Sequence, residues 1–162
     1  MSQDLAISKA AEMCVSMENA CQSVDALNGR RESIAGLVAK MKELTQVECP
    51  VKHRFSGGLY LREILMPAGS IVIGKIHATE HFNIIISGEC IVATTEGVKH
   101  IKAPYTFVSE PGIQKCVINL TDVIWQTTHV TDKTDVAEIE KDVIAEDYDK
   151  LQVDYIMKKL AG

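Results

Sequence analysis

The middle of this chain is a series of short apolar runs, each ended by glycine or proline. The breaks fall at Ser56-Gly57-Gly58, Met66-Pro67-Ala68-Gly69, Ser87-Gly88-Glu89, Thr95-Glu96-Gly97, Ala103-Pro104 and Glu110-Pro111-Gly112. Such punctuation is typical of strands joined by turns. The runs between the breaks predict strands at residues 59–66, 70–77, 83–87, 90–94, 98–101, 105–109, 115–119 and 123–130. Short strands at this spacing indicate a closed or sandwich-like β structure.

Helical periodicity marks both ends of the chain. Before residue 46, apolar side chains recur at helical spacing on either side of Asn28-Gly29, which predicts an α-hairpin. After residue 131, Asp132 or Thr134 is expected to cap a helix whose first turn holds two acids, Asp135 and Glu138. A last helix is expected over residues 148–160. The chain therefore divides into a helical hairpin (1–46), a β domain (47–131) and a C-terminal helical segment (132–162).

The composition excludes several classes of protein. With 162 residues, of which 46% are hydrophobic and 24% charged, the chain is expected to form one domain with a sizeable core. A net charge of −5 does not indicate the positively charged surface that binds a nucleic-acid polymer or an anionic membrane. No apolar run approaches the roughly 18 residues that span a bilayer, and the first residues lack a signal-peptide pattern, so a cytoplasmic location is expected. The amphipathic helical ends predict a homo-oligomer.

The cysteines do not form a recognisable framework. They are Cys14, Cys21, Cys49, Cys90 and Cys116, an odd number without a Cys-x-x-Cys pair. This spacing argues against a disulfide scaffold and against a sulfur-ligated zinc site. We expect reduced thiols that serve mainly as small apolar filler.

Two histidines four residues apart, His77 and His81, are the strongest functional signal. In a strand, side chains two residues apart share a face, so Lys75 and His77 are expected to point the same way. His81 would lie about 13 Å from His77 along a straight strand, at roughly 3.3 Å per residue. The two imidazoles can therefore share a ligand only if the chain bends at residues 78–80.

The segment around these histidines resembles the first cupin motif, which consists of a glycine, two histidines separated by one residue, a glutamate and a closing glycine. The overlay runs from Gly69 to Gly88, with Lys75 and His77 in the two histidine positions and His81 in the glutamate position. Residues 110–119 resemble the second motif, with Lys115 in the histidine position and Asn119 in the final asparagine position. The resemblance implies a mainly β fold, a single cupin-type β-barrel (jelly roll) over residues 47–131, with Lys75 and His77 facing its interior. Three of the four usual metal-ligand positions carry a different residue.

The chain is also similar to small cupin-like proteins encoded by tailed bacteriophages, over about residues 47–144. The matching strings are Cys49-Pro50-Val51-Lys52-His53-Arg54-Phe55, Gly58-Leu59-Tyr60-Leu61-Arg62-Glu63, Gly74-Lys75-Ile76-His77 with His81-Phe82-Asn83, Ala103-Pro104-Tyr105-Thr106-Phe107-Val108-Ser109, and Trp125-Gln126-Thr127-Thr128-His129-Val130-Thr131. This resemblance implies a viral origin and a place in the host cytosol. It implies no reaction.

One interpretation of the site is a metal centre. His77 and His81 would each give one nitrogen, and His129, Glu63 or His53 would supply a third ligand. Since Trp125, Thr127 and His129 share a strand face, His129 is expected to look into the same cavity. The resemblance to cupins implies iron, manganese, nickel or zinc. This interpretation predicts a metal-dependent isomerase, hydrolase or oxygenase.

A second interpretation is a cationic pocket without metal, because ammonium groups repel a divalent cation. Lys75 and Lys115, with the histidines and Arg62, would hold the phosphate or carboxylate of a small anionic molecule, a nucleotide among the candidates. Trp125 or Tyr60 would stack on a ring of that ligand. In a third interpretation, the lysines reach the barrel rim and the histidines satisfy interior hydrogen bonds. Metal and anion binding can also coexist, so a binding module and an enzyme both stay open.

Overall fold

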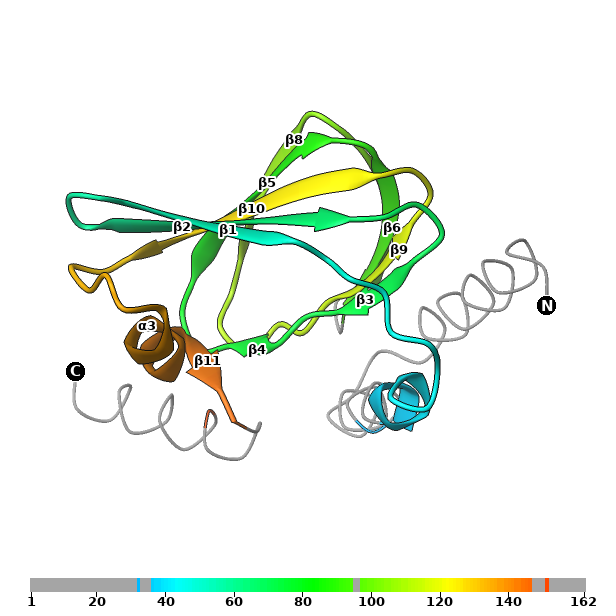
Figure 1. Ribbon diagram of the computed structural model, residues 1–162, viewed down its shortest axis with the longest axis horizontal. Coiled ribbons are helices and arrows are strands. Elements are labelled where there is room, and N and C mark those ends of the chain that lie inside the picture. The colour runs from blue at the N-terminus through cyan, green and yellow to red at the C-terminus, as the bar shows by residue number, and fades with distance from the viewer. Residues whose placement is uncertain (1–31, 33–35, 95–96, 147–150, 152–162) are drawn as a thin grey trace.

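The computed structural model describes residues 32, 36–94, 97–146 and 151 (Figure 1). Its strands are β1 (Val51–Ser56), β2 (Leu59–Met66), β3 (Ile71–Ile73), β4 (Ile76–His77), β5 (His81–Ser87), β6 (Glu89–Thr94), β7 (Gly97–Lys102), β8 (Tyr105–Ser109), β9 (Cys116–Asn119), β10 (Val123–Val130) and β11 (Ile144–Ala145), with helix α3 (Val136–Val143) between β10 and β11. The described part of the chain is therefore mainly β, as predicted.

The strands form two antiparallel sheets that share one core. The larger sheet has the order β1-β2-β10-β5-β8, and the smaller has the order β3-β9-β6-β7. Most neighbours in the sheets are distant in sequence, and this interleaving is a jelly roll. The core cluster draws on both sheets: Met66, Ile85, Val123 and Trp125 come from the larger, and Cys90, Val92, Ile101 and Val117 from the smaller. The predicted jelly-roll barrel is thus confirmed.

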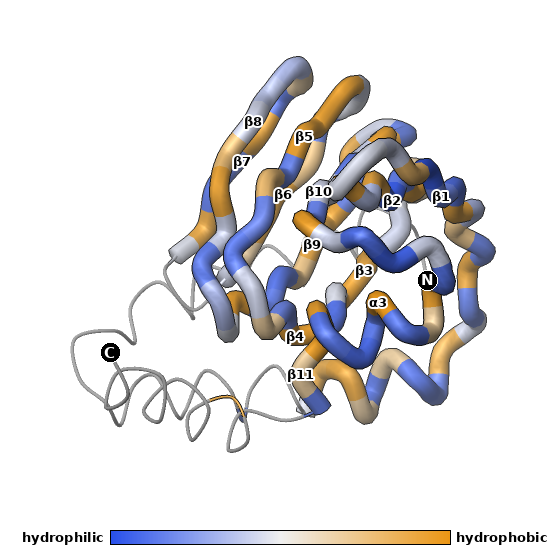
Figure 2. The backbone as a smooth tube through the Cα atoms, turned by 90° about the vertical axis from the view of Figure 1, so that its left-hand side faces the viewer, coloured by the Kyte–Doolittle hydropathy of each residue, from blue (hydrophilic) through white to orange (hydrophobic). Residues whose placement is uncertain are grey.

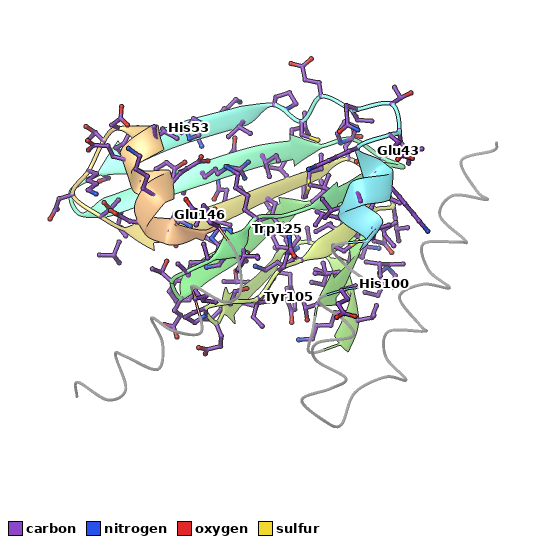
Figure 3. The ribbon with its side chains drawn as sticks, turned by 90° about the horizontal axis from the view of Figure 1, so that it is seen from below. Glu43, His53, His100, Tyr105, Trp125 and Glu146 are labelled. Atoms are coloured by element: carbon purple, nitrogen blue, oxygen red, sulfur yellow. The ribbon has the colours of Figure 1, made fainter. Side chains whose placement is uncertain are left out.

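Alternation along the strands decides which side chains reach the interior. In β10, Val123, Trp125, Thr127 and His129 are buried, and the residues between them are more exposed. The tube in Figure 2 shows that the strands carry both hydrophobic and hydrophilic residues. Successive side chains of a strand point to opposite faces. Trp125, Thr127 and His129 therefore all face the interior of the barrel. Figure 3 shows Trp125 between the layers of the barrel.

The strand bounds agree with the sequence prediction to within two residues, except at residues 70–77 and at two strands that were not predicted. The strands β2, β8 and β10 begin and end where predicted. The run at residues 70–77 splits into β3 and β4, because the chain leaves the strand at Gly74 and Lys75, where the Gly74 N–H donates to the Lys115 carbonyl. The sequence did not predict β1 or the two-residue β11.

The C-terminal segment closes one end of the barrel beside β4 (Figure 1). Helix α3 is capped by Asp135, whose carboxylate accepts from the Glu138 N–H at 2.9 Å, so the predicted caps Asp132 and Thr134 were wrong. Ile139 and Val143 of this helix bury against Tyr60. The chain then pairs β11 with β4 in an antiparallel bridge.

Most of the predicted terminal helices lie outside the described residues. Of the hairpin at 1–46, helical structure is described at residues 32 and 36–41, where Leu37 packs against the core cluster of Ala93, Cys116 and Ile118. The helix predicted at 148–160 also lies outside them, apart from residue 151. The homo-oligomer inferred from these helices stays a prediction. Among the described residues, no helix is both long enough and apolar enough to cross a membrane.

The turn between β5 and β6 requires a glycine. Gly88 has a φ of +96°, and a Cβ there would lie 2.9 Å from the Val123 Cα and closer still to the Asp122 carbonyl oxygen. We expect Gly88→Ala to lower the free energy of unfolding by about 2–4 kcal/mol, from left-handed backbone strain and overpacking together. Urea denaturation measures this. Gly57→Ala is the control, since its Cβ would meet nothing within 4 Å. Equal midpoints for the two variants would contradict the prediction.

Candidate functional site

A bend between β4 and β5 brings His77 and His81 together. His77 ends β4, residues 78–79 bend, and His81 begins β5. The two ring centroids are 4.0 Å apart, so the predicted bend exists. The C-terminal segment holds it in place, because the Ala78 N–H donates to the Val143 carbonyl at 2.8 Å and Ile144 pairs with His77.

His129 on β10 completes a cluster of three imidazoles. Its ring centroid lies 5.2 Å from that of His77 and 4.9 Å from that of His81. The three residues can each offer a ligand nitrogen within 4.8 Å of the others. We call His77, His81 and His129 the histidine triad. Of the three residues predicted as a third ligand, the structure brings only His129 to the other two.

The other two predicted third ligands point elsewhere. Glu63 follows Arg62 in β2 and therefore faces the outside of the sheet, where it accepts hydrogen bonds from Arg54 and Gln126. His53 lies on the edge strand β1, where its Nδ1 is 2.7 Å from the Tyr60 hydroxyl. The spacing of these residues in the sequence allowed either of them as the third ligand. Strand alternation excludes Glu63, and the position of His53 on the edge strand excludes that residue.

Burial keeps the histidine triad neutral. Burial, together with unfavourable charge interactions with His81 and Lys115, lowers the pKa of His77 to about 2. Burial likewise lowers the pKa values of His81 and His129 to about 4, with a further contribution from Lys115. All three imidazoles are therefore uncharged at neutral pH. The neutral ring is the form that binds a metal.

Hydrogen bonds fix one tautomer and leave two nitrogens without partners. The His81 Nδ1 lies 2.9 Å from the Thr79 carbonyl, to which it donates, so the His81 Nε2 keeps its lone pair. That Nε2 is buried and has no hydrogen-bond partner, and the same is true of the His77 Nδ1. A backbone carbonyl that orients a histidine through its other nitrogen is a common feature of metal sites.

The donor set fits a divalent transition metal. In a tetrahedral site with metal–nitrogen bonds of about 2.0–2.1 Å, two ligand nitrogens of one zinc ion lie about 3.4 Å apart. The nitrogens of the triad lie within 4.8 Å of one another, so the rings would need to close by up to about 1.4 Å to bind the ion. Three neutral nitrogen donors, two of them lacking any other partner, match what such an ion requires.

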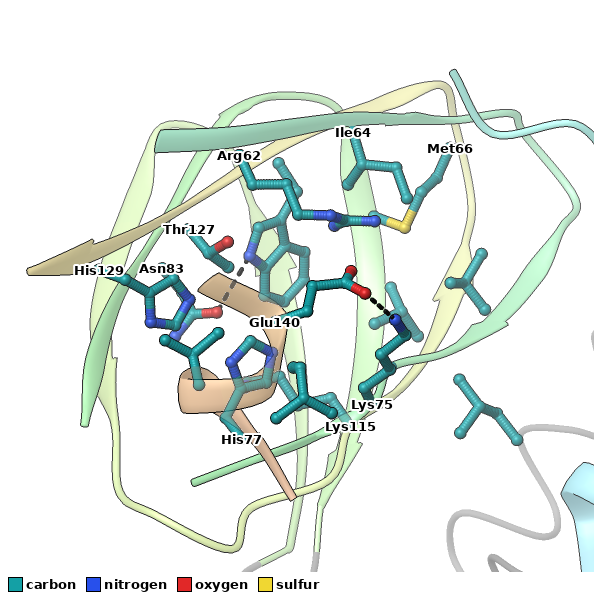
Figure 4. Close-up of a pocket in the computed structure, with 17 residues that line it drawn as sticks. Arg62, Ile64, Met66, Lys75, His77, Asn83, Lys115, Thr127, His129 and Glu140 are labelled. Atoms are coloured by element: carbon teal, nitrogen blue, oxygen red, sulfur yellow. Dashed lines mark hydrogen bonds and ion pairs between the residues drawn. The ribbon is translucent and has the colours of Figure 1, made fainter. Parts of the chain in front are cut away.

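Two members of the triad, His77 and His129, line a cavity of about 280 Å³ inside the barrel (Figure 4). From β2 it is lined by Arg62, Ile64 and Met66, from β10 by Trp125, Thr127 and His129, and from other elements by Lys75, His77, Asn83, Lys115 and Glu140 among others. The structure thus brings together most of the residues predicted for a ligand site. Thr127, Asn83 and Glu140 were not among them. For Thr127 and Asn83 the available signal is the two-residue spacing from His129 and His81.

Lys75 lies at the mouth of this cavity, not inside it. Its ammonium is 2.9 Å from the Glu140 carboxylate, and its side chain is 59% exposed. The prediction that it points into the barrel with His77 is corrected, because the break between β3 and β4 ends the alternation on which it was based. Lys115 does line the interior and is 7% exposed, so its predicted location is confirmed.

Of the two aromatic residues predicted to stack on a ligand, only Trp125 lines the cavity. Tyr60 is 2% exposed and is not part of the cavity lining. Its ring packs 6.2 Å from that of His129 on one side and 5.4 Å from that of Phe55 on the other, so it supports His129 from behind. Trp125 does line the cavity, where its indole N–H donates to the side-chain oxygen Oδ1 of Asn83 at 3.1 Å. A stacking role stays a prediction for Trp125 and is corrected for Tyr60.

No protein-family model and no curated protein sequence matches this chain. Solved structures do. The cupin domain of Cnp3 from Schizosaccharomyces pombe has 17% identity over 62% of this chain and 70% of that one, with a TM-score of 0.46. An RmlC-like cupin family protein with a double-stranded β-helix fold from Methanocaldococcus jannaschii has 14% identity over 51% and 80%, with a TM-score of 0.44. A cupin domain from Bordetella pertussis has 14% identity over 54% and 98%, also at 0.44. The jelly-roll assignment itself rests on the strand order given above, and the viral origin stays a prediction.

Proposed function

We propose that the barrel holds one divalent transition metal on His77, His81 and His129, and that this centre captures a small anionic molecule in the adjoining cavity. One observation carries the proposal: three neutral imidazoles, two of them on buried residues, offer nitrogens within 4.8 Å of one another, and two of the rings have a buried nitrogen without a partner. A buried polar atom that lacks a hydrogen bond costs about 1–3 kcal/mol. A bound metal removes that cost.

The surroundings of the histidine triad suit this role. The Thr79 carbonyl holds His81 in the tautomer that presents Nε2, and Tyr60 packs behind His129. Imidazole donors suit zinc, iron, nickel and copper, whereas manganese prefers oxygen ligands. We therefore favour zinc, iron or nickel among the metals that the resemblance implies. When bound, the metal supplies a Lewis acid with open positions beside the cavity.

The positive charge around the site supports an anionic ligand. Three neutral histidines leave the full charge of a divalent cation uncompensated. The Arg62 guanidinium lines the same cavity, and it has no hydrogen bond or ion pair within the part of the chain that the structure describes. The argument from Lys75 against a metal loses its force, since that ammonium is paired with Glu140 at the mouth. Lys115 does line the interior, and an anion bound between it and the metal would offset their repulsion. Metal and anion binding then belong to one site.

Cobalt titration tests the proposal, because tetrahedral or five-coordinate Co²⁺ absorbs visibly and reports its ligands. We expect the metal-free full chain to develop visible bands that saturate near one Co²⁺ per chain. Acetate or inorganic phosphate should then shift these bands, as an anion enters an open position. Absence of saturable bands would refute the metal centre. Bands that no anion shifts would refute anion capture at the metal.

A second candidate function is catalysis on the captured molecule. The described residues supply three protein ligands, and three with an open fourth position are typical of catalytic zinc sites, whereas structural sites use four. An enzyme would convert a bound acid only in the metal-loaded form. Mass spectrometry of candidate acids after incubation with loaded wild-type chain and with His129→Gln checks this, and unchanged acids in both samples would count against it.

A further inference from the structure

The cavity wall formed by two neighbouring strands changes from polar to apolar along its length. They are β2 and β10, whose antiparallel register places Arg62 opposite Thr127 and Ile64 opposite Trp125, with His129 before these pairs and Met66 after them. Each step of two residues advances roughly 6.6 Å along a strand. All six residues line the cavity. From the histidine triad, the wall therefore passes to a polar pair and then to an apolar region.

The polar pair has hydrogen-bonding capacity that the described chain leaves unused. Thr127 is 8% exposed, and its hydroxyl is buried without a partner. The Arg62 guanidinium, directly across the ladder, has no side-chain partner in the described residues. Residues opposite each other in an antiparallel pair have Cβ atoms about 4.5–5.5 Å apart. One carboxylate can therefore accept two N–H bonds from the planar guanidinium and an O–H bond from Thr127.

The rest of the wall suits a hydrocarbon. Ile64, Met66 and the face of Trp125 form it, and Val72 and Val117 line the same cavity. The cavity volume of about 280 Å³ lies just below the roughly 300–1,000 Å³ that is usual for ligand pockets, which favours a small ligand over a nucleotide.

We propose that the natural ligand is a small monocarboxylate with an apolar body of about five to seven carbons. The carboxylate lies between Arg62 and Thr127 beside the histidine triad, and the body extends along Ile64 and Trp125 toward Met66. This inference deepens the proposed function, because it names the class of anion that the site captures.

Calorimetric titration of the metal-loaded full chain with acetate, butanoate, hexanoate and octanoate tests the ligand class. We expect the affinity to rise about fourfold per added methylene up to six or seven carbons, and then to stop rising. Inorganic phosphate and adenosine monophosphate should bind more weakly than hexanoate. Equal affinities for acetate and hexanoate, or tighter binding of phosphate or the nucleotide, would overturn the inference.

Two pairs of variants test Arg62 and Thr127, which we call the polar anchor of the carboxylate. Arg62→Gln should weaken hexanoate binding at least about tenfold, because a bond to a charged group is lost. Arg54→Gln is its control, since Arg54 pairs with Glu63 on the outer face. The near-isosteric Thr127→Val should weaken binding about three- to tenfold, whereas Thr128→Val, on the opposite face of β10, should not. Wild-type affinity in Arg62→Gln or Thr127→Val, each confirmed to be folded by its melting transition, would contradict the anchor.

The same two titrations separate this inference from the proposed function. If the wild-type chain binds cobalt stoichiometrically but shows no dependence on carboxylate chain length, the ligand class is wrong and the metal centre stands. If it binds hexanoate in an Arg62-dependent way but takes up no cobalt, the metal centre is wrong and the carboxylate site stands.

Discussion

Replacing His81 with glutamine is expected to reduce the affinity for Zn²⁺ or Co²⁺ at least about 100-fold. Loss of even an outer-shell partner costs about 10–100-fold in metal affinity, and the loss of a ligand itself should cost no less. Glutamine is uncharged and similar in length, so the bend between β4 and β5 should survive. His77→Gln and His129→Gln should give losses of the same order, because the three residues form one donor set. Equilibrium dialysis followed by elemental analysis measures the bound metal.

Two further histidines provide matched controls for this experiment. His100 lies on β7 with an exposed side chain, 2.7 Å from a Glu89 carboxylate oxygen. His53 contacts Tyr60 on the side away from the triad. We expect His100→Gln and His53→Gln to bind metal as the wild type does. Metal retained in His81→Gln would exclude the triad as the binding site. Metal lost in His53→Gln would place the site near Tyr60.

The fold was predictable where a strand carries its own signal. The strands β2, β8 and β10 each combine apolar or β-branched residues with a turn residue at or near an end, and local sequence is enough to define them. By contrast, β1 has five exposed residues out of six, so its sequence reads as a polar loop. It is a strand because it pairs along its full length with β2 at the edge of the sheet. That pairing is tertiary information that no local window contains.

The site was predictable in its location more than in its detail. Periodicity and the cupin-like motif placed His77, Lys115 and His129 in one cavity, and the required bend at residues 78–80 exists. Lys75 was misplaced because the prediction extended one straight strand through a break. Tyr60 was misplaced because its inner side is covered by α3, an element far away in sequence.

The polar anchor, Arg62 and Thr127, has hydrogen-bonding capacity that the described chain leaves unused, and the sequence could not predict this. The same-face position of Thr127 follows from spacing. That its hydroxyl and the Arg62 guanidinium lack partners depends on every neighbouring side chain, and only the assembled barrel shows it. The proposed site depends on polar groups that lack a hydrogen-bond partner, and a sequence pattern does not show which polar groups lack one.

The metal-free chain should lose stability steeply as the pH falls from 7 to 5. An unfolded histidine titrates near pH 6.5, whereas the folded pKa is about 2 for His77 and about 4 for His81 and His129. Between these values the unfolded chain binds protons that the folded chain does not, so acid favours unfolding. At pH 5, 1.5 units below the unfolded pKa, each such histidine costs about 2 kcal/mol. The effect is large beside a total stability of about 5–15 kcal/mol.

Urea denaturation at pH 7.5, 6 and 5 with a chelator present measures this loss, and the variants assign it. His81→Gln and His129→Gln should each flatten the dependence on pH, because glutamine takes up no proton in either state. The pH range separates this effect from that of Glu63, whose pKa is lowered by hydrogen bonds from Gln126 and Arg54 and whose stabilisation is lost only as the pH falls below about 4.3. A wild-type midpoint that stays constant from pH 7.5 to 5 would mean that the folded histidines bind protons as readily as unfolded ones, and burial of the triad would then be wrong.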